Sequence, residues 1–167
     1  GTFIAQKLQG KGRIVEICGL DGSSPAMERH LGFMDAIKPY PGIQVIASEE
    51  GNWKEEGGVQ AMKRILKKTQ DFDYVFAHSD RLAWGAYEAA KQMGLQHRYK
   101  FTGVDGMATK GGGLELVRDG IFEASYLYPT KGDEVIALAM KILKHQPFER
   151  KNYLSTSIIT QENAELT

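Results

Sequence analysis

Five polar or aromatic residues, each predicted to lie at or just after the end of an apolar, strand-like stretch, could form a binding site for a small molecule. They are Arg29, Trp53, Ser79, Asp105 and Tyr128. A guanidinium fork and a carboxylate suit neighbouring hydroxyl groups, and such charge-assisted hydrogen bonds contribute about 1.5 to 3 kcal/mol each. An aromatic face can cover the apolar C–H side of a sugar ring. These residue types together predict a site for a small polyol.

Each of these residues also has a purely structural interpretation. Arg29 could be an ordinary exposed helix residue, Ser79 a helix N-cap, and Asp105 a turn residue before a glycine. Tyr128 could simply cover the edge of a sheet. What favours the binding interpretation is that the residues follow successive predicted strands, whose carboxyl ends meet at one edge of a parallel sheet.

Motifs for catalysis do not emerge from the sequence. The glycine-rich segment "DGMATKGGG" at 105–113 matches neither common phosphate-loop pattern. A phosphoacceptor domain needs an acidic pair where this chain has only Asp21, and no G-x-S-x-G elbow surrounds a serine. The histidines, at positions 30, 78, 97 and 145, lack the spacing of metal ligands. We expect no catalysis, cofactor or metal; a small enzyme that uses the glycine-rich loop is the alternative.

Charge and composition narrow the classes of partner. The 167 residues include 21 basic and 21 acidic side chains, so no broad attraction for nucleic acid is expected, and no direct contact with it. The single cysteine, Cys18, excludes an intramolecular disulfide and is predicted to be a buried strand residue. No apolar stretch approaches the roughly 20 residues that a membrane-spanning helix needs.

Short apolar runs alternate with helical patterns along the whole chain. The predicted strands are residues 13–18, 43–48, 74–78, 100–105, 122–128 and 153–159. Four helical stripes are predicted to pack on the sheet: Met27, Leu31, Met34, Ile37; Val59, Met62, Ile65, Leu66; Ala83, Ala86, Tyr87, Ala90; and Val135, Leu138, Ala139, Ile142, Leu143. This alternation predicts an α/β fold with a doubly wound, mostly parallel Rossmann-like sheet flanked by helices.

Longer phrases resemble the type 1 periplasmic sugar-binding proteins and the effector domains of lactose-repressor-type regulators. The segments that carry the resemblance are "GRIVEICGLDGSSPAMERHLGFMDAI", "DFDYVFAHSDRLAWGAYEAAKQMG", "KFTGVDG" and "LVRDGIFEASYLYPTKGDEVIALAMKIL". The resemblance implies two Rossmann-like lobes joined by a hinge that close on a sugar. It identifies residues 1–167 as the C-terminal lobe, excised from a longer protein. Within it, residues 129–150 would hold the hinge crossing and a helix that belongs to the missing N-terminal lobe.

The resemblance also assigns roles to the five candidate residues. Arg29 falls at the family's sugar-binding arginine, Trp53 at an aromatic that flanks the ring, and Asp105 at a hydroxyl-binding aspartate. Ser79 stands where the ribose binders have asparagine, which leaves the ligand's hydroxyl pattern open. Tyr128, just before Pro129, falls at a polar position that faces the ligand.

The phrases "GSSPAMERHLGFMDAI", "AHSDRLAWGAYEAAK" and "YPTKGDEVI" look most like periplasmic sensor domains of hybrid two-component histidine kinases. The resemblance therefore implies a non-catalytic, periplasmic sugar sensor that signals by hinge closure. Its partners would be a sugar and the missing lobe, and a homodimer is left open. The alternative is the effector domain of a cytoplasmic, lactose-repressor-type transcriptional regulator.

Overall fold

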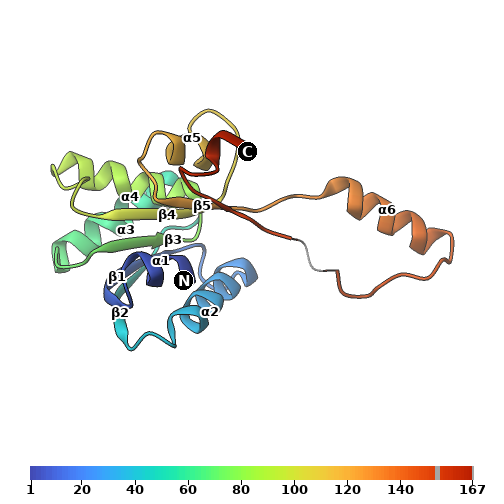
Figure 1. Cartoon of the computed structure of the whole chain (residues 1–167), viewed down its shortest axis with the longest axis horizontal. Coiled ribbons are helices and arrows are strands. Elements are labelled where there is room, and N and C mark those ends of the chain that lie inside the picture. Colours follow the sequence, from blue (N-terminus) through green and yellow to red (C-terminus); the bar gives the residue numbers. More distant parts are fainter. Residues whose placement is uncertain (153–154, 167) are drawn as a thin grey trace.

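A six-stranded sheet forms the centre of the computed structural model, which describes residues 1–152 and 155–166 (Figure 1). The strand order is β2-β1-β3-β4-β5-β6, in which β1 to β5 pair in parallel and β6 pairs antiparallel with β5. The strands are β1 Lys11–Cys18, β2 Gly42–Glu50, β3 Tyr74–Ala77, β4 Lys100–Asp105, β5 Ala124–Leu127 and β6 Ile158–Ile159. The helices are α1 Thr2–Lys7, α2 Ser24–Ile37, α3 Glu55–Lys68, α4 Asp80–Gln92, α5 Gly113–Arg118, α6 Gly132–Leu143 and the short 3-10 helix Ala164–Leu166.

Both faces of the sheet are buried, as expected for parallel strands. Successive residues of a strand point to opposite faces, so Val15 and Ile17 join one core cluster while Ile14 joins the other. The first cluster includes side chains of α3 and α4, and the second includes side chains of α1 and α2. The predicted doubly wound α/β fold is confirmed.

Two of the four predicted helical stripes lie in the core as expected. On α3, Met62, Ile65 and Leu66 are buried and Val59 is half-buried. On α4, Ala83, Ala86 and Ala90 are buried and Tyr87 packs against the same cluster. These two helices therefore cover one face of the sheet.

The predicted core face of α2 is wrong except at Ile37. Met27, Leu31 and Met34 are exposed, and the buried positions are instead Ala26, Phe33 and Ile37. The Phe33 ring stacks on Phe76 of β3, with ring centroids 4.3 Å apart. Apolar residues occur on two sides of this helix, and the stacking partner on the sheet selects the side that is buried.

The stripe on α6 does not pack on this sheet, which corrects the fourth prediction. Val135, Ile142 and Leu143 are exposed, and no residue of α6 is buried. Figure 1 shows α6 at the end of an extended arm, well away from the sheet. The strand predicted at 153–159 is also shorter than expected. Only Ile158–Ile159 forms a strand, and residues 153 and 154 lie outside the described residues.

Candidate functional site: a pocket at the carboxyl ends of the strands

All five candidate residues line one open pocket of about 290 Å³, together with Pro25 and Arg81. They come from the beginnings of α2 and α4 and from the loops or strand ends that follow β2, β4 and β5. This is the edge of the sheet where ligands bind in open α/β folds. The structure thus brings together side chains that are up to 99 positions apart in the chain.

Arg29 contacts three of the other residues that line the pocket. Its Nη1 donates a hydrogen bond to the carbonyl oxygen of His78, and its Nη2 lies 3.6 Å from Oδ1 of Asp105. The guanidinium carbon lies 5.2 Å from the ring centroid of Trp53 and 5.2 Å from that of Tyr128. Two aromatic rings and a backbone carbonyl therefore hold the guanidinium in place, which is how a rigid hydrogen-bonding fork is prepared for a ligand.

Trp53 owes its position to an unusual loop. Asn52 and Trp53 both have positive φ angles, of 51° and 59°. This conformation is costly for a bulky residue and persists only where the surroundings impose it. The indole ring packs directly against Gly19, in the loop after β1, where a side chain would collide with it. The ring is half-buried against the core and still lines the pocket.

Ser79 has the structural role that its sequence position also allowed. Its side chain caps α4, where Oγ accepts a hydrogen bond from the Leu82 amide at 3.3 Å. Ser79 is almost fully buried yet lines the pocket. The hydroxyl can still donate its proton, so capping and ligand binding are compatible.

Asp105 ends β4 in a strained backbone conformation, with φ of 122°. Burial raises the pKa of its carboxyl, while the charges of Arg29 and Arg81 lower it. Its backbone carbonyl accepts the Tyr128 amide at 3.0 Å, which ties the loop after β5 to the end of β4. Tyr128 itself is 61% exposed, so most of its ring faces the open side of the pocket.

Asp80 fixes the turn that presents Asp105. Its Oδ2 accepts the Gly106 amide at 2.8 Å, and its Oδ1 accepts the Ser125 hydroxyl at 2.6 Å. Asp80 is only 5% exposed, and burial raises the pKa of its carboxyl from about 3.8 to about 7. Sequence reasoning missed both this residue and Arg81, although they are the next two residues after Ser79 in "HSDR".

The raised pKa of Asp80 predicts a pH-dependent stability. An unfolded aspartate is ionised above about pH 4, whereas the folded carboxyl keeps its proton to about pH 7. Folding therefore binds a proton in this window, and the contribution of Asp80 is fully present below pH 4 and lost as pH rises through 7. We expect the free energy of unfolding to lose up to about 4 kcal/mol from this group.

Urea unfolding at pH 5 and pH 8, of the wild type and Asp80→Asn, measures that contribution. The asparagine adds a cost of its own by losing an acceptor, but that cost does not change with pH. The difference in stability between the two pH values should therefore be smaller in the variant. An equal difference in both proteins would contradict the predicted titration.

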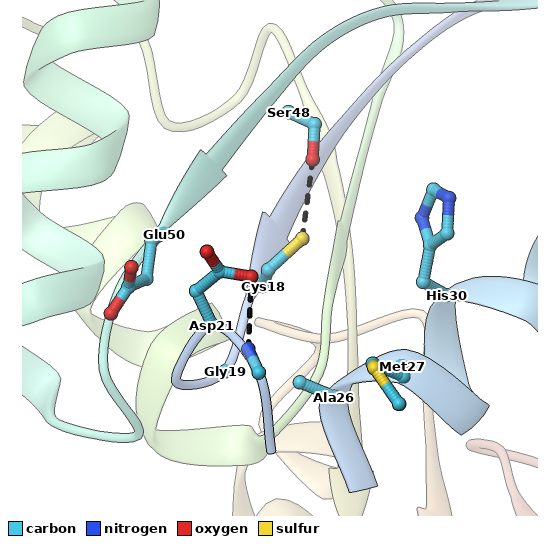
Figure 2. Close-up of a pocket in the computed structure, with 9 residues that line it drawn as sticks. Cys18, Gly19, Asp21, Ala26, Met27, His30, Ser48 and Glu50 are labelled. Atoms are coloured by element: carbon cyan, nitrogen blue, oxygen red, sulfur yellow. Dashed lines mark hydrogen bonds between the residues drawn. The ribbon is translucent and has the colours of Figure 1, made fainter. Parts of the chain in front are cut away.

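A second pocket, of about 360 Å³, shares no residue with the first (Figure 2). Its walls include Cys18, whose Sγ lies 3.1 Å from the Ser48 hydroxyl, and His30. Cys18 is half-buried, and burial raises the pKa of its thiol to about 11. The thiol is therefore protonated and unreactive at neutral pH.

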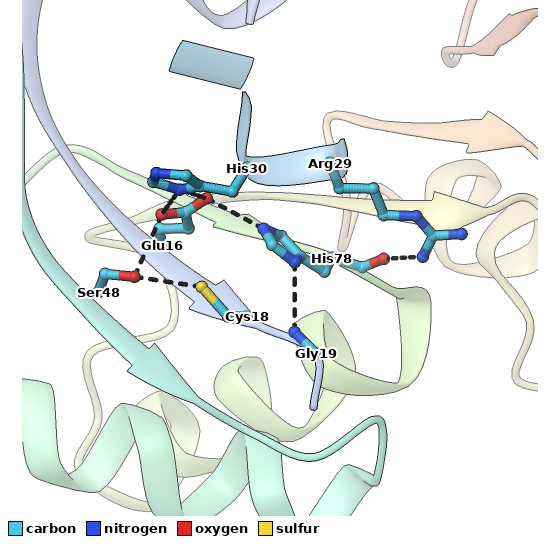
Figure 3. Close-up of polar contacts among 7 residues, drawn as sticks. All are labelled: Glu16, Cys18, Gly19, Arg29, His30, Ser48 and His78. Carbon is cyan, nitrogen blue, oxygen red and sulfur yellow. Dashed lines mark hydrogen bonds and ion pairs between the residues drawn. The ribbon is translucent and has the colours of Figure 1, made fainter. Parts of the chain in front are cut away.

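Behind this pocket, Glu16, Cys18 and His78 each have one potential metal-ligand atom, all within 4.8 Å of one another. Their hydrogen bonds argue against a metal (Figure 3). The Gly19 amide donates to Nδ1 of His78 at 3.2 Å, so the proton of this ring is on Nε2, which donates to Glu16 at 3.0 Å. A metal needs unprotonated ligand atoms, and here both the thiol and Nε2 carry protons. We interpret the cluster as a hydrogen-bond network.

Comparison with known proteins identifies the family. Residues 1–147 match the model of the periplasmic binding protein domain. The chain belongs to this family. The ribose import binding protein of Haemophilus influenzae is 29% identical over 163 residues, which cover 96% of this chain and 54% of that protein. The galactofuranose-binding protein of Escherichia coli is 33% identical over 100 residues, or 58% of this chain and 31% of that protein.

Among solved structures, the fructose-binding periplasmic domain of a hybrid two-component system is 43% identical to this periplasmic binding protein domain. The TM-score is 0.95, and the match covers 98% of this chain and 55% of that one. The chain thus spans about half the length of this structure and of the ribose-binding protein. The predicted family and fold are confirmed. In the described part of the chain, no helix is long and apolar enough to cross a membrane.

Proposed function

We propose that this periplasmic binding protein domain is the C-terminal lobe of a sugar-binding sensor, which binds a monosaccharide with Arg29, Trp53, Ser79, Asp105 and Tyr128. The observation that carries the proposal is their convergence on one open pocket at the carboxyl ends of the strands. Hydrogen-bonding groups alternate there with two aromatic rings, which is the combination that a polyol ring needs. The domain performs no chemistry on the sugar.

The second lobe supplies the other side of the site. Two facts support this part of the proposal: the chain spans about half of its relatives, and the pocket is open. The apolar side chains of α6 are exposed at the end of an arm that leaves the sheet after β5. We assign residues 129–150 to the hinge crossing and to a helix that packs on the N-terminal lobe.

Binding of sugar then shifts a hinge equilibrium, because a closed arrangement gains contacts that an open one lacks. The likeness to the fructose-binding domain of a hybrid two-component system supports a role as the periplasmic input of a membrane-anchored kinase. The kinase part of the protein carries out the reaction, and this lobe supplies about half of the contacts that recognise the sugar.

A thermal-shift screen tests the proposal. The two-lobe domain is expected to gain stability with one of fructose, ribose, arabinose or galactose, because a ligand that binds only the folded state raises its melting temperature. Calorimetry then gives the affinity. The 167-residue chain alone should bind the same sugar far more weakly. Equal affinity of the chain and the two-lobe domain would contradict the assignment of half the site to another lobe.

A further inference from the structure

Glu16 is a fully buried carboxylate in the middle of β1, a position that costs free energy unless its oxygens are fully paired. It has three hydrogen-bond partners from three different elements. His30 Nδ1 on α2 lies 2.9 and 3.0 Å from its two oxygens, and the Ser48 hydroxyl on β2 donates at 3.1 Å. His78, at the end of β3, is the third partner.

His78 connects this carboxylate to the sugar pocket. Its ring is fully buried and has both nitrogens engaged, with Nε2 donating to Glu16 and Nδ1 accepting from the Gly19 amide. Gly19 is the residue against which the Trp53 indole packs. The backbone carbonyl of His78 accepts the hydrogen bond from Arg29 (Figure 3). His78 therefore contributes to the support of two pocket side chains, Trp53 through Gly19 and Arg29 through its own backbone carbonyl.

We propose that Glu16 and His78 are positioning residues for the sugar site. The Glu16 carboxylate fixes the tautomer and orientation of the His78 ring, and His78 holds the Gly19 loop beneath Trp53 and the carbonyl that anchors Arg29. Neither side chain lines the pocket. The inference rests on the function proposed above and adds to it the residues that set the geometry of the site.

The charges around the network favour an ionised Glu16. Burial raises the pKa of this carboxyl, but its interactions with His78 and His30 outweigh burial, so the net shift is downward. The titratable and charged groups around the network are Cys18 and Asp21 near β1, Arg29 and His30 on α2, Glu50 at the end of β2, and His78. His30 is the half-exposed member, with 44% of its side chain accessible.

Replacing Glu16 with leucine should weaken sugar binding although no residue of the pocket is changed. The Nε2 proton of His78 then has no acceptor, and an unpaired buried donor is costly enough to shift the ring, so we expect affinity to fall about tenfold or more. Calorimetry on the two-lobe domain measures this effect. Unchanged affinity in a folded Glu16→Leu protein would overturn the proposal.

Glu16→Gln supplies a readout that a purely structural role would not change. The amide oxygen can still accept from His78 Nε2, and the amide N–H₂ can donate to Nδ1 of His30. We therefore expect Glu16→Gln to bind sugar within about threefold of the wild type, whereas Glu16→Leu loses about tenfold or more.

If Glu16→Gln loses as much affinity as Glu16→Leu, the acceptor for His78 does not set the geometry of the site and the positioning role is wrong. Nitrogen NMR of the 167-residue chain tests the network without any sugar, since His78 should show a protonated Nε2 and an unprotonated Nδ1. Failure of the wild type to bind sugar would therefore refute the proposed function, whereas the opposite tautomer would refute this inference.

Discussion

Replacing Asp105 with alanine is expected to reduce the sugar affinity of the two-lobe domain by about 100-fold or more, the largest effect at any single pocket residue. A carboxylate can accept from two neighbouring hydroxyls, and each charge-assisted hydrogen bond contributes about 1.5 to 3 kcal/mol. Asp105 is also the acidic partner of Arg29, at 3.6 Å. Its loss leaves the guanidinium held only by the two rings and a carbonyl. Calorimetry with the sugar found in the thermal-shift screen measures the change.

Two further variants make this result specific. Asp105→Asn keeps the size of the side chain and one acceptor, so it should lie between the wild type and Asp105→Ala. Asp35→Ala removes an exposed aspartate on α2 outside the pocket and should leave affinity unchanged. Circular dichroism checks that each variant is folded. Binding by Asp105→Ala within about threefold of the wild type, under half of one such bond, would exclude this carboxylate from the site.

The general position of the pocket could be predicted because it follows from topology. Parallel strands end at one edge of the sheet, so side chains after successive strands had to converge there. Arg29, Trp53 and Asp105 were found in this way, and the structure places them in one pocket. Arg81 was missed because an arginine in the first turn of a helix is usually a solvated surface residue. Only the orientation of α4 turns it toward Asp105.

The network around Glu16 could not be predicted from spacing alone. Glu16, His30 and His78 lie on three separate elements, and their sequence separations carry no pattern. One signal was present, since the glutamate in "RIVEIC" interrupts an apolar strand that is buried on both faces. A buried carboxylate requires donors, but the sequence does not say which side chains supply them.

The buried face of α2 shows a different limit of sequence reasoning. Apolar residues lie on two sides of the helix, so periodicity alone allows two faces. The choice of Phe33 over Leu31 depends on the ring of Phe76, which lies on a strand 43 positions further along the chain. Helix packing is thus decided by the partner surface.

The substitution with the largest expected effect on stability is at Gly85, which lies where α3 and α4 cross closely. A methyl group at Gly85 would meet the backbone of α3, colliding with the Glu55 carbonyl and lying 2.8 Å from the Val59 amide nitrogen. Backbone atoms cannot move aside as a flexible side chain can, so the helices must separate. We expect Gly85→Ala to lower the free energy of unfolding by about 2 to 3 kcal/mol. The melting temperature should fall by about 2 to 4 °C for each kcal/mol.

Gly32 on α2 is the matched control, because it is also a glycine inside a helix. Nothing lies within 4 Å of the position that its Cβ would take. Gly32→Ala should therefore show only the gain in helix propensity and raise the free energy of unfolding by about 0.5 to 1 kcal/mol. Thermal unfolding of both variants therefore compares the same glycine-to-alanine change at two positions. It is expected to lower the melting temperature at Gly85 and to raise it at Gly32. Stabilisation by Gly85→Ala would mean that α3 and α4 are farther apart than described, and the core that supports Ser79 and Asp80 would need revision.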